Sequence, residues 1–421
     1  MIKYFETENK ETYCLEATLA NTENNDGINT VSLAQENIGL FRYVNEMNDP
    51  CPTATLEYID TSQIIDRFVG KQYVVCSVVF KHLIIEKAGN VSTKTENEAE
   101  STSMGFIVNN IEIIQRTGTQ IHYRLHLIST IWTKLMRKVK YTNYKQTEKN
   151  SVIEILKTIC DDNKIPIDEE SFQKCKSTSQ LKYISGNNDN FYTCFRYLMN
   201  KSFYNQDNIK DSALKGIVFN DKLEKLCMFD FTNDFKYQGL VNANISMLKD
   251  KTFDIEGSEQ VNIACSLSKS NVERMEGLFP TILHNYNFET NEIGNETTNS
   301  SAIAAYCSGL ALKNQNNIAI RDAELYTRDY SDWNNNMNLY SSSFSSLKDN
   351  NGLIVNIHGA MSVNPGWKCG VAVQSIQEST WWTNGPSLYQ KATKDVYKQL
   401  EGGWYISKVV HLINPMKKKF R

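Results

Sequence analysis

The chain has 421 residues, of which 41% are hydrophobic and 22% are charged, and its formal net charge is −3. This length exceeds one ordinary core and indicates several domains, and the composition is that of a globular protein rather than a disordered chain. The small net charge argues against a protein that holds nucleic acid by electrostatic attraction alone.

The residue pattern also argues against a membrane protein, a secreted protein and a protein held together by disulfides or zinc. No apolar run reaches the roughly 20 residues of a membrane helix, and residues 1–19 lack the basic and apolar segments of a secretory signal. The ten cysteines are scattered singly, with no CxxC pair and none at zinc-ligand spacing from a histidine. We therefore expect reduced, mostly buried thiols, no disulfide framework, no metal site and no membrane segment.

The first 130 residues read as strands separated by polar turns. Residues 53–60 alternate apolar and polar side chains, as a half-buried strand does, and 71–86 is dense in β-branched and aromatic residues. The polar stretch 88–103 predicts a loop. Strands are also predicted at 104–115 and 119–130, on either side of a glycine-containing turn.

His122 and His126 are four residues apart, a spacing that would place two candidate metal ligands on one face of a helix. The alternation of Ile121, Tyr123 and Leu125 indicates a strand instead. On a strand the two histidines lie ~13 Å apart. We therefore expect both on the polar face of a sheet, without a metal.

The middle of the chain changes to helical periodicity. Ser151 and Glu154 form a capping-box pattern at the start of a predicted helix. The apolar residues along one face of that helix are Val152, Ile155, Leu156 and Ile159. A second helix is expected from about residue 188, and the strands 215–219 and 225–231 read as a hairpin. Residues 232–350 are rich in polar residues and give only short strand signals.

Two segments near opposite ends of the chain share a residue pattern. Residues 105–114 read GFIVNNIEII and residues 403–412 read GWYISKVVHL, each with a glycine, an aromatic residue, two apolar and two polar residues, and a mixed apolar run. Gly70 precedes the upstream strand of the first copy, and Gly366 precedes that of the second. This order of parts predicts two related β domains with an α+β segment inserted between them.

The candidate structural residues follow from this repeat. Glycine suits a strand entry that tolerates no Cβ, and the aromatic residue after it gives the strand a buried anchor. Tryptophans in the loop between the second pair of strands are read as a subunit interface in preference to a sugar-stacking platform. The expected structural and interface positions are Gly70, Gly105, Phe106, Gly366, Trp381, Trp382, Gly403 and Trp404. His411 aligns with Ile113 in the repeat, so we do not expect it to be a catalytic base.

No motif of a familiar catalytic site is present in the sequence. HExxH, GxSxG, the P-loop and Cys/His pairs are all missing. A glycosidase-type pair of carboxylates stays open, because carboxylates are plentiful, although Glu276 reads as a surface acid. We expect no catalytic residue, no cofactor and no enzymatic activity.

The order of parts resembles the baseplate hub proteins of contractile-tailed bacteriophages. More distantly, it is similar to phage late-control proteins and to the spike proteins of type VI secretion. The segments that carry the resemblance are 54–60, 70–80, 105–115, 119–129, 151–165, 183–200, 365–373 and 402–415. Most of 232–350 lies outside it.

The resemblance implies an α+β fold that is mainly β, with two tandem tail-tube-like β domains and an α+β segment inserted between them. The implied units are a first tube-like domain at 1–130, an inserted α+β domain at 131–240, an accessory or split β region at 241–345 and a second tube-like domain at 346–421.

The resemblance also implies a structural function. Three copies would form a ring of six similar domains that adapts a sixfold tail tube to a threefold central spike and forms part of the DNA conduit. The implied partners are further copies in a homotrimer, the tail tube protein, the central spike protein and the tape-measure protein. Viral DNA would pass transiently, without sequence-specific binding. The implied location is the tail baseplate of the virion, after assembly in the host cytoplasm. The alternatives are a tail-associated peptidoglycan hydrolase and a carbohydrate-binding tail-tip protein.

Overall fold

The structure is α+β and mainly β, as predicted. The computed structural model describes residues 5–6, 12–21, 29–47, 49–71, 73–84, 97–136, 143–144, 152–174, 183–184, 190–200, 215–220, 224–230, 243–247, 261–266, 281–287, 292–298, 321–324, 352–357, 364–366, 368–373 and 402–420. Trp381, Trp382 and Ser151 lie outside these described residues.

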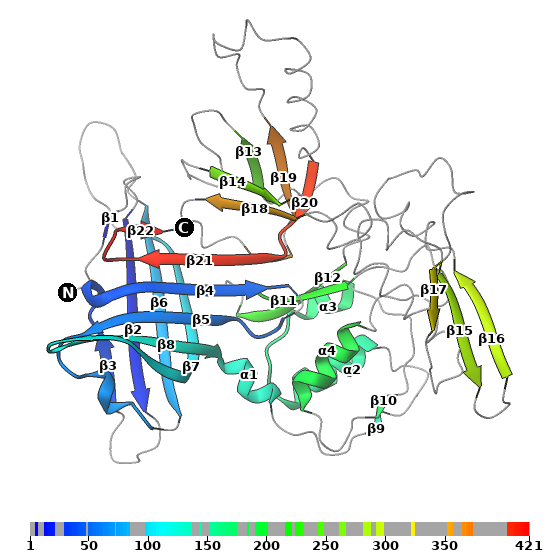
Figure 1. Cartoon of the computed structure of the whole chain (residues 1–421), viewed down its shortest axis with the longest axis horizontal. Coiled ribbons are helices and arrows are strands. Elements are labelled where there is room, and N and C mark those ends of the chain that lie inside the picture. The colour runs from blue at the N-terminus through cyan, green and yellow to red at the C-terminus, as the bar shows by residue number, and fades with distance from the viewer. Residues whose placement is uncertain are drawn as a thin grey trace, which may run out of the picture.

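A ten-stranded antiparallel sheet forms the largest part of the described structure. Its strand order is β1-β2-β6-β7-β8-β5-β4-β21-β22, with β3 paired to β2. The strands are β1 Phe5–Glu6, β2 Thr12–Asn21, β3 Asn29–Leu33, β4 Ile38–Glu46, β5 Thr53–Asp60, β6 Val74–Ile84, β7 Asn97–Thr117, β8 Gln120–Ser129, β21 Lys408–Asn414 and β22 Lys419–Phe420. Figure 1 shows β2 and β6 crossing β4, β5 and β21 at a steep angle, so the sheet curls into two layers.

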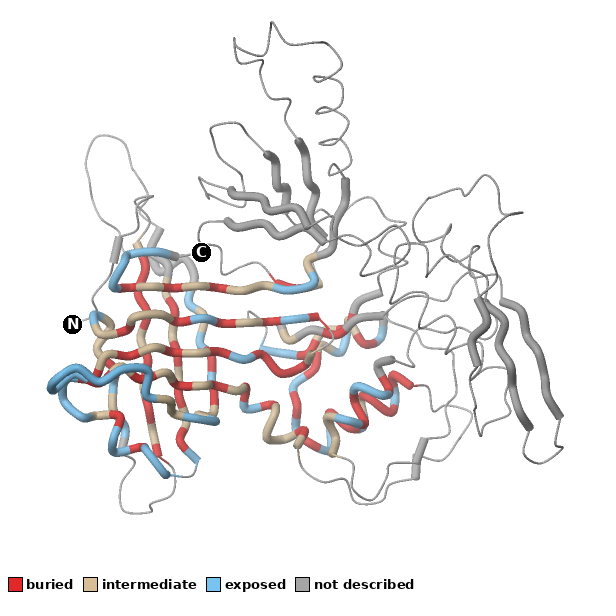
Figure 2. The backbone as a smooth tube through the Cα atoms, in the orientation of Figure 1, coloured by how far each residue is buried: buried red, intermediate tan, exposed pale blue. Residues whose placement is uncertain are grey.

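The core of the sheet follows from period-two alternation along its strands. In β5 and β8 every second side chain is buried, and Figure 2 shows the same alternation along neighbouring strands. Large aromatic side chains fill the space between the layers: Tyr13, Phe41, Tyr43, Tyr58, Phe68, Phe80, Phe106 and Tyr123. The predicted strands at 53–60, 71–86 and 119–130 are therefore confirmed. The predicted loop at 88–103 is wrong over its second half, because β7 begins at Asn97.

Two short 3-10 helices connect strands of the large sheet. One is η1 at Gln35–Asn37 and the other is η2 at Ile65–Arg67. Asp60, which is 1% exposed, fixes the turn into η2, because its carboxylate accepts hydrogen bonds from the backbone of Ser62 at 2.9 Å and of Ile65 at 2.7 Å. Tyr123 of β8 donates a hydrogen bond to Asp66 and so attaches the same turn to the sheet.

A helical unit follows the first eight strands and has a core of its own. Its elements are α1 Thr130–Leu135, α2 Val152–Asp162, α3 Glu169–Lys174, α4 Phe191–Asn200, β11 Lys215–Asn220 and β12 Lys225–Asp230. The predicted apolar stripe of α2 is buried in that core, and β11 and β12 form the predicted hairpin. The helix that was expected from about residue 188 is α4, which starts at Phe191. The Asn190 side chain caps it by accepting a hydrogen bond from the backbone of Thr193 at 2.8 Å.

Buried polar contacts join this unit to the large sheet. The Asn45 amide of β4 donates a hydrogen bond to the Phe219 carbonyl of β11 at 2.8 Å. Tyr192 of α4 lies 3.5 Å from both carboxylate oxygens of Asp49, which follows β4. Burial raises the pKa of the Asp49 carboxyl, and the nearby Arg196 guanidinium opposes that rise.

The remaining described strands form small sheets. They are β9 Asn143–Tyr144 with β10 Tyr183–Ile184; β13 Ala243–Met247, β19 Lys368–Val373 and β20 Gly402–Tyr405; β14 Val261–Ser266 with β18 Gly352–Ile357; and β15 Thr281–Asn287, β16 Glu292–Thr298 and β17 Arg321–Glu324. β19 pairs parallel to β13 and antiparallel to β20.

The C-terminal strand differs from the expectation for 346–421. β21 pairs with β4 from Lys408 to Ile413 and therefore belongs to the large sheet of the N-terminal region. Residues 403–412 are divided between β20 and β21, in two different sheets, whereas 105–114 lies within the single strand β7. The repeated residue pattern thus does not correspond to a repeated strand arrangement. Apart from this strand, the four domain ranges stay predictions.

Candidate functional site

The candidate site lies on the outer face of the large sheet, across β4, β5, β8 and β7. Because alternate side chains of these strands fill the core, the others form rows on the opposite face. One row is Leu40, Glu57, Arg124 and Glu112, and the next is Arg42, Thr55, His126 and Asn110. The antiparallel register therefore brings together side chains as far apart in the sequence as Arg42 and His126, which are 84 positions apart.

The first row contains a network of ion pairs. Arg124 donates to Glu57 Oε1 from Nε at 3.1 Å and from Nη2 at 2.8 Å, and its Nη1 donates to Glu112 Oε2 at 3.3 Å. His126 Nε2 lies 3.1 Å from the same Glu112 oxygen, and His122 Nε2 lies 3.7 Å from Glu57 Oε2. The hydrogen bond from His126 and the Arg124 guanidinium lower the pKa of the Glu112 carboxyl. Both carboxylates of the row are thus matched with cationic or hydrogen-bonding partners.

This arrangement confirms that His122 and His126 lie on the polar face of a strand. Each lies beside a different carboxylate, Glu57 for His122 and Glu112 for His126. Within the described ranges no group of three His, Cys, Asp or Glu side chains has the geometry of a metal site.

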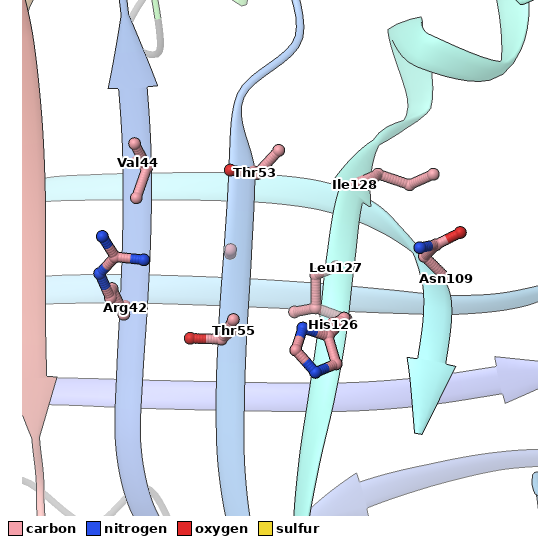
Figure 3. A pocket seen from close by; sticks show the side chains of 9 residues that line it. Arg42, Val44, Thr53, Thr55, Asn109, His126, Leu127 and Ile128 are labelled. Carbon is pink, nitrogen blue, oxygen red and sulfur yellow. The ribbon is translucent and has the colours of Figure 1, made fainter. Parts of the chain in front are cut away.

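A hollow of about 230 Å³ lies beside the second row. Figure 3 shows Arg42 on β4, Thr55 on β5 and His126 on β8 at one level, with Val44, Thr53 and Ile128 one level further along and Asn109 on β7. Ala54 and Leu127 complete the lining. The hollow therefore combines a guanidinium, an imidazole, an amide and two hydroxyl groups above an apolar floor.

The second part of the candidate site is the outer edge of β21. On one side β21 pairs with β4, and on the other β22 pairs with Ile413 and Asn414. Among the strands that the structure describes, none pairs with the outer edge of 408–412. Lys408 faces the neighbouring strand, with its Nζ 2.9 Å from Glu46 Oε2. An edge of this kind presents backbone N–H and C=O groups that can pair with a strand of another chain.

The positions expected from the first copy of the repeat have different environments. Phe106 is 2% exposed and packs edge-on against Phe41 and Tyr43, at centroid distances of 6.5 and 6.1 Å, so it is the buried anchor that was predicted. Gly70 has a φ of +74°, a conformation that glycine adopts without strain. Gly105 lies inside β7, and a Cβ there would be 3.9 Å from Thr130 Cγ2, which is an ordinary contact. The expectation that Gly105 tolerates no Cβ is therefore wrong.

The positions expected from the second copy lie beside the C-terminal strand. Gly366 has a φ of +84°, and its backbone N–H donates to the Ile406 carbonyl at 2.7 Å. In β20, Gly403 pairs with Gly370 and Trp404 pairs with Cys369. Their role at an interface, like that of the Trp381–Trp382 pair, stays a prediction.

His411 is a buried residue whose packing was missed by the repeat comparison. Its aligned partner Ile113 is 59% exposed, whereas His411 is 4% exposed. The His411 ring stacks on Tyr43 at a centroid distance of 6.1 Å, and burial lowers the pKa of the imidazole to about 4. A neutral, packed imidazole contributes to the hydrophobic core. Ile413 is two residues from His411, so the period-two alternation of a strand that includes Ile413 predicts that both side chains lie on the buried face.

The six cysteines whose side chains the structure describes are free thiols. Five of these six are buried and Cys227 is half-buried. Burial raises the pKa of Cys14 to about 11 and that of Cys160 to about 12, which disfavours the reactive thiolate. None of the described helices combines the length and hydropathy that a membrane crossing requires.

Comparison with known proteins defines the fold. No protein-family model matches the sequence, and a search of curated proteins finds no match. Among solved structures, a tail protein from Neisseria meningitidis has a TM-score of 0.50 at 9% sequence identity, over 96% of this chain and 94% of that chain. The 43 kDa tail protein of prophage MuSo2 from Shewanella oneidensis has a TM-score of 0.48 at 8% identity, over 96% and 100%. A Francisella PdpA–VgrG complex has a TM-score of 0.45 at 12% identity, over 96% of this chain and 50% of that chain.

The similarity to the Neisseria protein extends over nearly all of both chains. The chain therefore has the fold of a tail protein. The resemblance to phage baseplate hub proteins that the sequence indicated is confirmed at the level of this tail-protein fold.

Proposed function

We propose that this chain is a structural baseplate hub, three copies of which form a ring in a phage tail. The observation that carries this proposal is the outer edge of β21, with which no strand of the described ranges pairs along 408–412, in a chain with a tail-protein fold. Strand edges cause uncontrolled association unless they are covered, and closed rotational symmetry covers every edge while limiting growth.

Two tube-like units per copy would give such a ring six similar faces. The large sheet is the first unit. The three-stranded sheet of β13, β19 and β20, which contains Gly403 and Trp404, is our candidate for the second. A ring with six such faces docks onto a sixfold tail tube on one side, and its threefold side accepts a trimeric central spike.

The remaining proposed partners follow from this position in the tail. The ring contacts the tail tube protein and the spike, and the tape-measure protein is a further candidate partner. Viral DNA passes through the bore after the spike leaves. Tight phosphate binding would stall that passage, so the mild net charge of −3 suits the role. The protein acts in the baseplate of the virion and is assembled in the host cytoplasm.

Native mass spectrometry of the purified full chain tests the proposal. We expect trimers at micromolar concentration and rings in electron micrographs. A monomer that forms no complex with a co-expressed spike protein would contradict the proposal.

A turbidity assay on purified peptidoglycan separates the hub from a wall-degrading enzyme. We expect no clearing by the purified protein, and clearing would favour the hydrolase. Replacing Trp381 and Trp382 with alanine is expected to dissociate trimers, because tryptophan is favoured at interface centres. Loss of binding to immobilised glycans with the trimer intact would favour the carbohydrate-binding alternative.

A further inference from the structure

The two ends of the β7-β8-β5-β4-β21 layer have different neighbours. At one end β8 leads directly into α1, and the Asn45 amide of β4 bonds to β11, so the helical unit lies there. In this antiparallel order β7 and β21 run in the same direction, so the turns that follow them both lie at the opposite end. We call this opposite end, residues 113–120 and 414–419, the turn end; Figure 1 shows it on the left, away from the helical unit.

Cations gather at the turn end. Arg116 precedes the turn between β7 and β8, and Lys417, Lys418 and Lys419 lie in or directly after the turn between β21 and β22; all four side chains are exposed. None of the ion pairs between described residues includes Arg116, Lys417 or Lys418. The Lys417 N–H donates to Asn414 Oδ1 at 2.8 Å, so these lysines are presented from a structured turn.

Carboxylates near the turn end are fewer. Glu36 of η1 and Asp66 of η2 are exposed, and Asp66 accepts a hydrogen bond from Tyr123. Asp60 is 1% exposed, and its carboxylate is already bonded to backbone N–H groups. Arg67 of η2 adds a further exposed cation. The described residues around the turn end therefore carry a positive charge, although the whole chain has a net charge of −3.

Exposed apolar side chains lie among these cations. Met416 is 51% exposed beside the lysines, and Ile113 and Ile114 are 59% and 38% exposed on the approach to the β7–β8 turn. Exposed apolar groups that gather in this way mark protein–protein contacts, whose centres are apolar and whose rims are polar. A nucleic-acid backbone is bound through cations and polar groups instead. The combination therefore fits an acidic protein surface better than DNA.

We propose that the turn end docks onto an acidic surface of the tail tube protein. This inference rests on the proposed hub, and it adds which end of the layer meets the tube and which charge the tube presents there. The bore of a ring continues into a tube through an end to which no other unit is attached, and the turn end lies opposite the helical unit. The cations attract and orient the partner, while Ile113, Ile114 and Met416 are removed from water in the contact.

Biolayer interferometry of the purified full chain against the tail tube protein encoded with it tests the inference. The R116E/K417E variant reverses two exposed charges that no described ion pair uses, so we expect the Kd to rise about tenfold or more. Added sodium chloride should weaken the wild-type complex. The control is K164E/K225E, which reverses two exposed lysines of the helical unit and should leave the Kd unchanged. Equal losses in the two variants, or no loss in R116E/K417E, would overturn the inference.

The I113S/M416S variant tests the apolar part separately, with the cations retained. We expect it to raise the Kd as well, and an unchanged Kd would contradict the apolar contact. Native mass spectrometry should show that both turn-end variants remain trimers; if R116E/K417E does not, I113S/M416S decides. A wild-type monomer would contradict the proposed hub, whereas wild-type trimers that do not bind the tube protein would overturn this inference alone. Binding of a labelled DNA duplex or of the spike protein that is lost in R116E/K417E would also overturn it, in favour of that partner.

Discussion

The His411 ring lies parallel to that of Tyr43, with an interplanar angle of 7° and a centroid distance of 6.1 Å. The two residues are cross-strand partners in β21 and β4, although they are separated by most of the sequence. This stacked pair helps to attach β21 to the first sheet.

The stability of the sheet should fall with acidity through His411. Burial lowers the imidazole pKa from 6.5 to about 4, so between these values the unfolded chain binds a proton that the folded chain does not. The free energy of unfolding should therefore decrease as pH drops below 6.5, by up to about 3 kcal/mol near pH 4. Urea denaturation from pH 4 to 8 measures this, with H411F as the comparison. If the two proteins lose stability in parallel, the burial of His411 has no part in the effect.

Phe106 and Ile113 lie on the same strand with opposite environments. Phe106 is 2% exposed and Ile113 is 59% exposed. We expect F106A to cost about 3–5 kcal/mol of unfolding free energy, because it removes ring contacts and leaves a cavity. I113A should change it by less than about 0.5 kcal/mol. Chemical denaturation of both variants checks this, and comparable costs would contradict the assigned faces of β7.

Gly70 and Gly105 should respond differently to alanine. Gly70 has a φ of +74°, where a Cβ costs roughly 1–2 kcal/mol, so G70A should lower the melting temperature. G105A should be close to neutral, since its Cβ would make an ordinary 3.9 Å contact with Thr130. Differential scanning calorimetry distinguishes the two. A severe loss in G105A would restore the idea that this strand position excludes a side chain.

Asn45 should hold the helical unit against the large sheet. N45A removes a buried amide that donates to the carbonyl of the half-buried Phe219, and the loss of this bond should cost about 1–3 kcal/mol of unfolding free energy. Hydrogen exchange should then become faster in β11 and β12. N110A, on the exposed outer face, is the matched control and should leave exchange unchanged. Equal exchange rates of β11 and β12 in the two variants would show that the 2.8 Å hydrogen bond does not hold the helical unit against the large sheet.

Local patterns predicted individual elements, because each depends on residues a few positions apart. The alternation at 53–60 and 119–130 corresponds to β5 and β8, and the stripe at 152–159 corresponds to α2. The polar composition of 97–103 gave no sign of a strand. This segment is extended because its backbone pairs with β6, and that pairing does not depend on apolar side chains in 97–103.

Partners between distant segments could not be predicted in the same way. The residues of 408–414 indicate a strand but do not identify β4 as its neighbour. The hollow is less visible still, because Arg42, Thr55 and His126 meet only through the register of three strands. The periodicity of the sequence predicts whether a side chain lies on the buried or the exposed face of its strand. Which side chains become neighbours on that face depends on how the strands pair, and the sequence pattern does not show this.

The pairing of β21 with β4 also has a consequence for synthesis. The ribosome completes β4 more than 350 residues before it reaches β21, so the nascent sheet keeps an unfinished border beside β4 until β21 has been made. During that interval the backbone groups of β4 that later pair with β21 have to be kept from pairing with another chain.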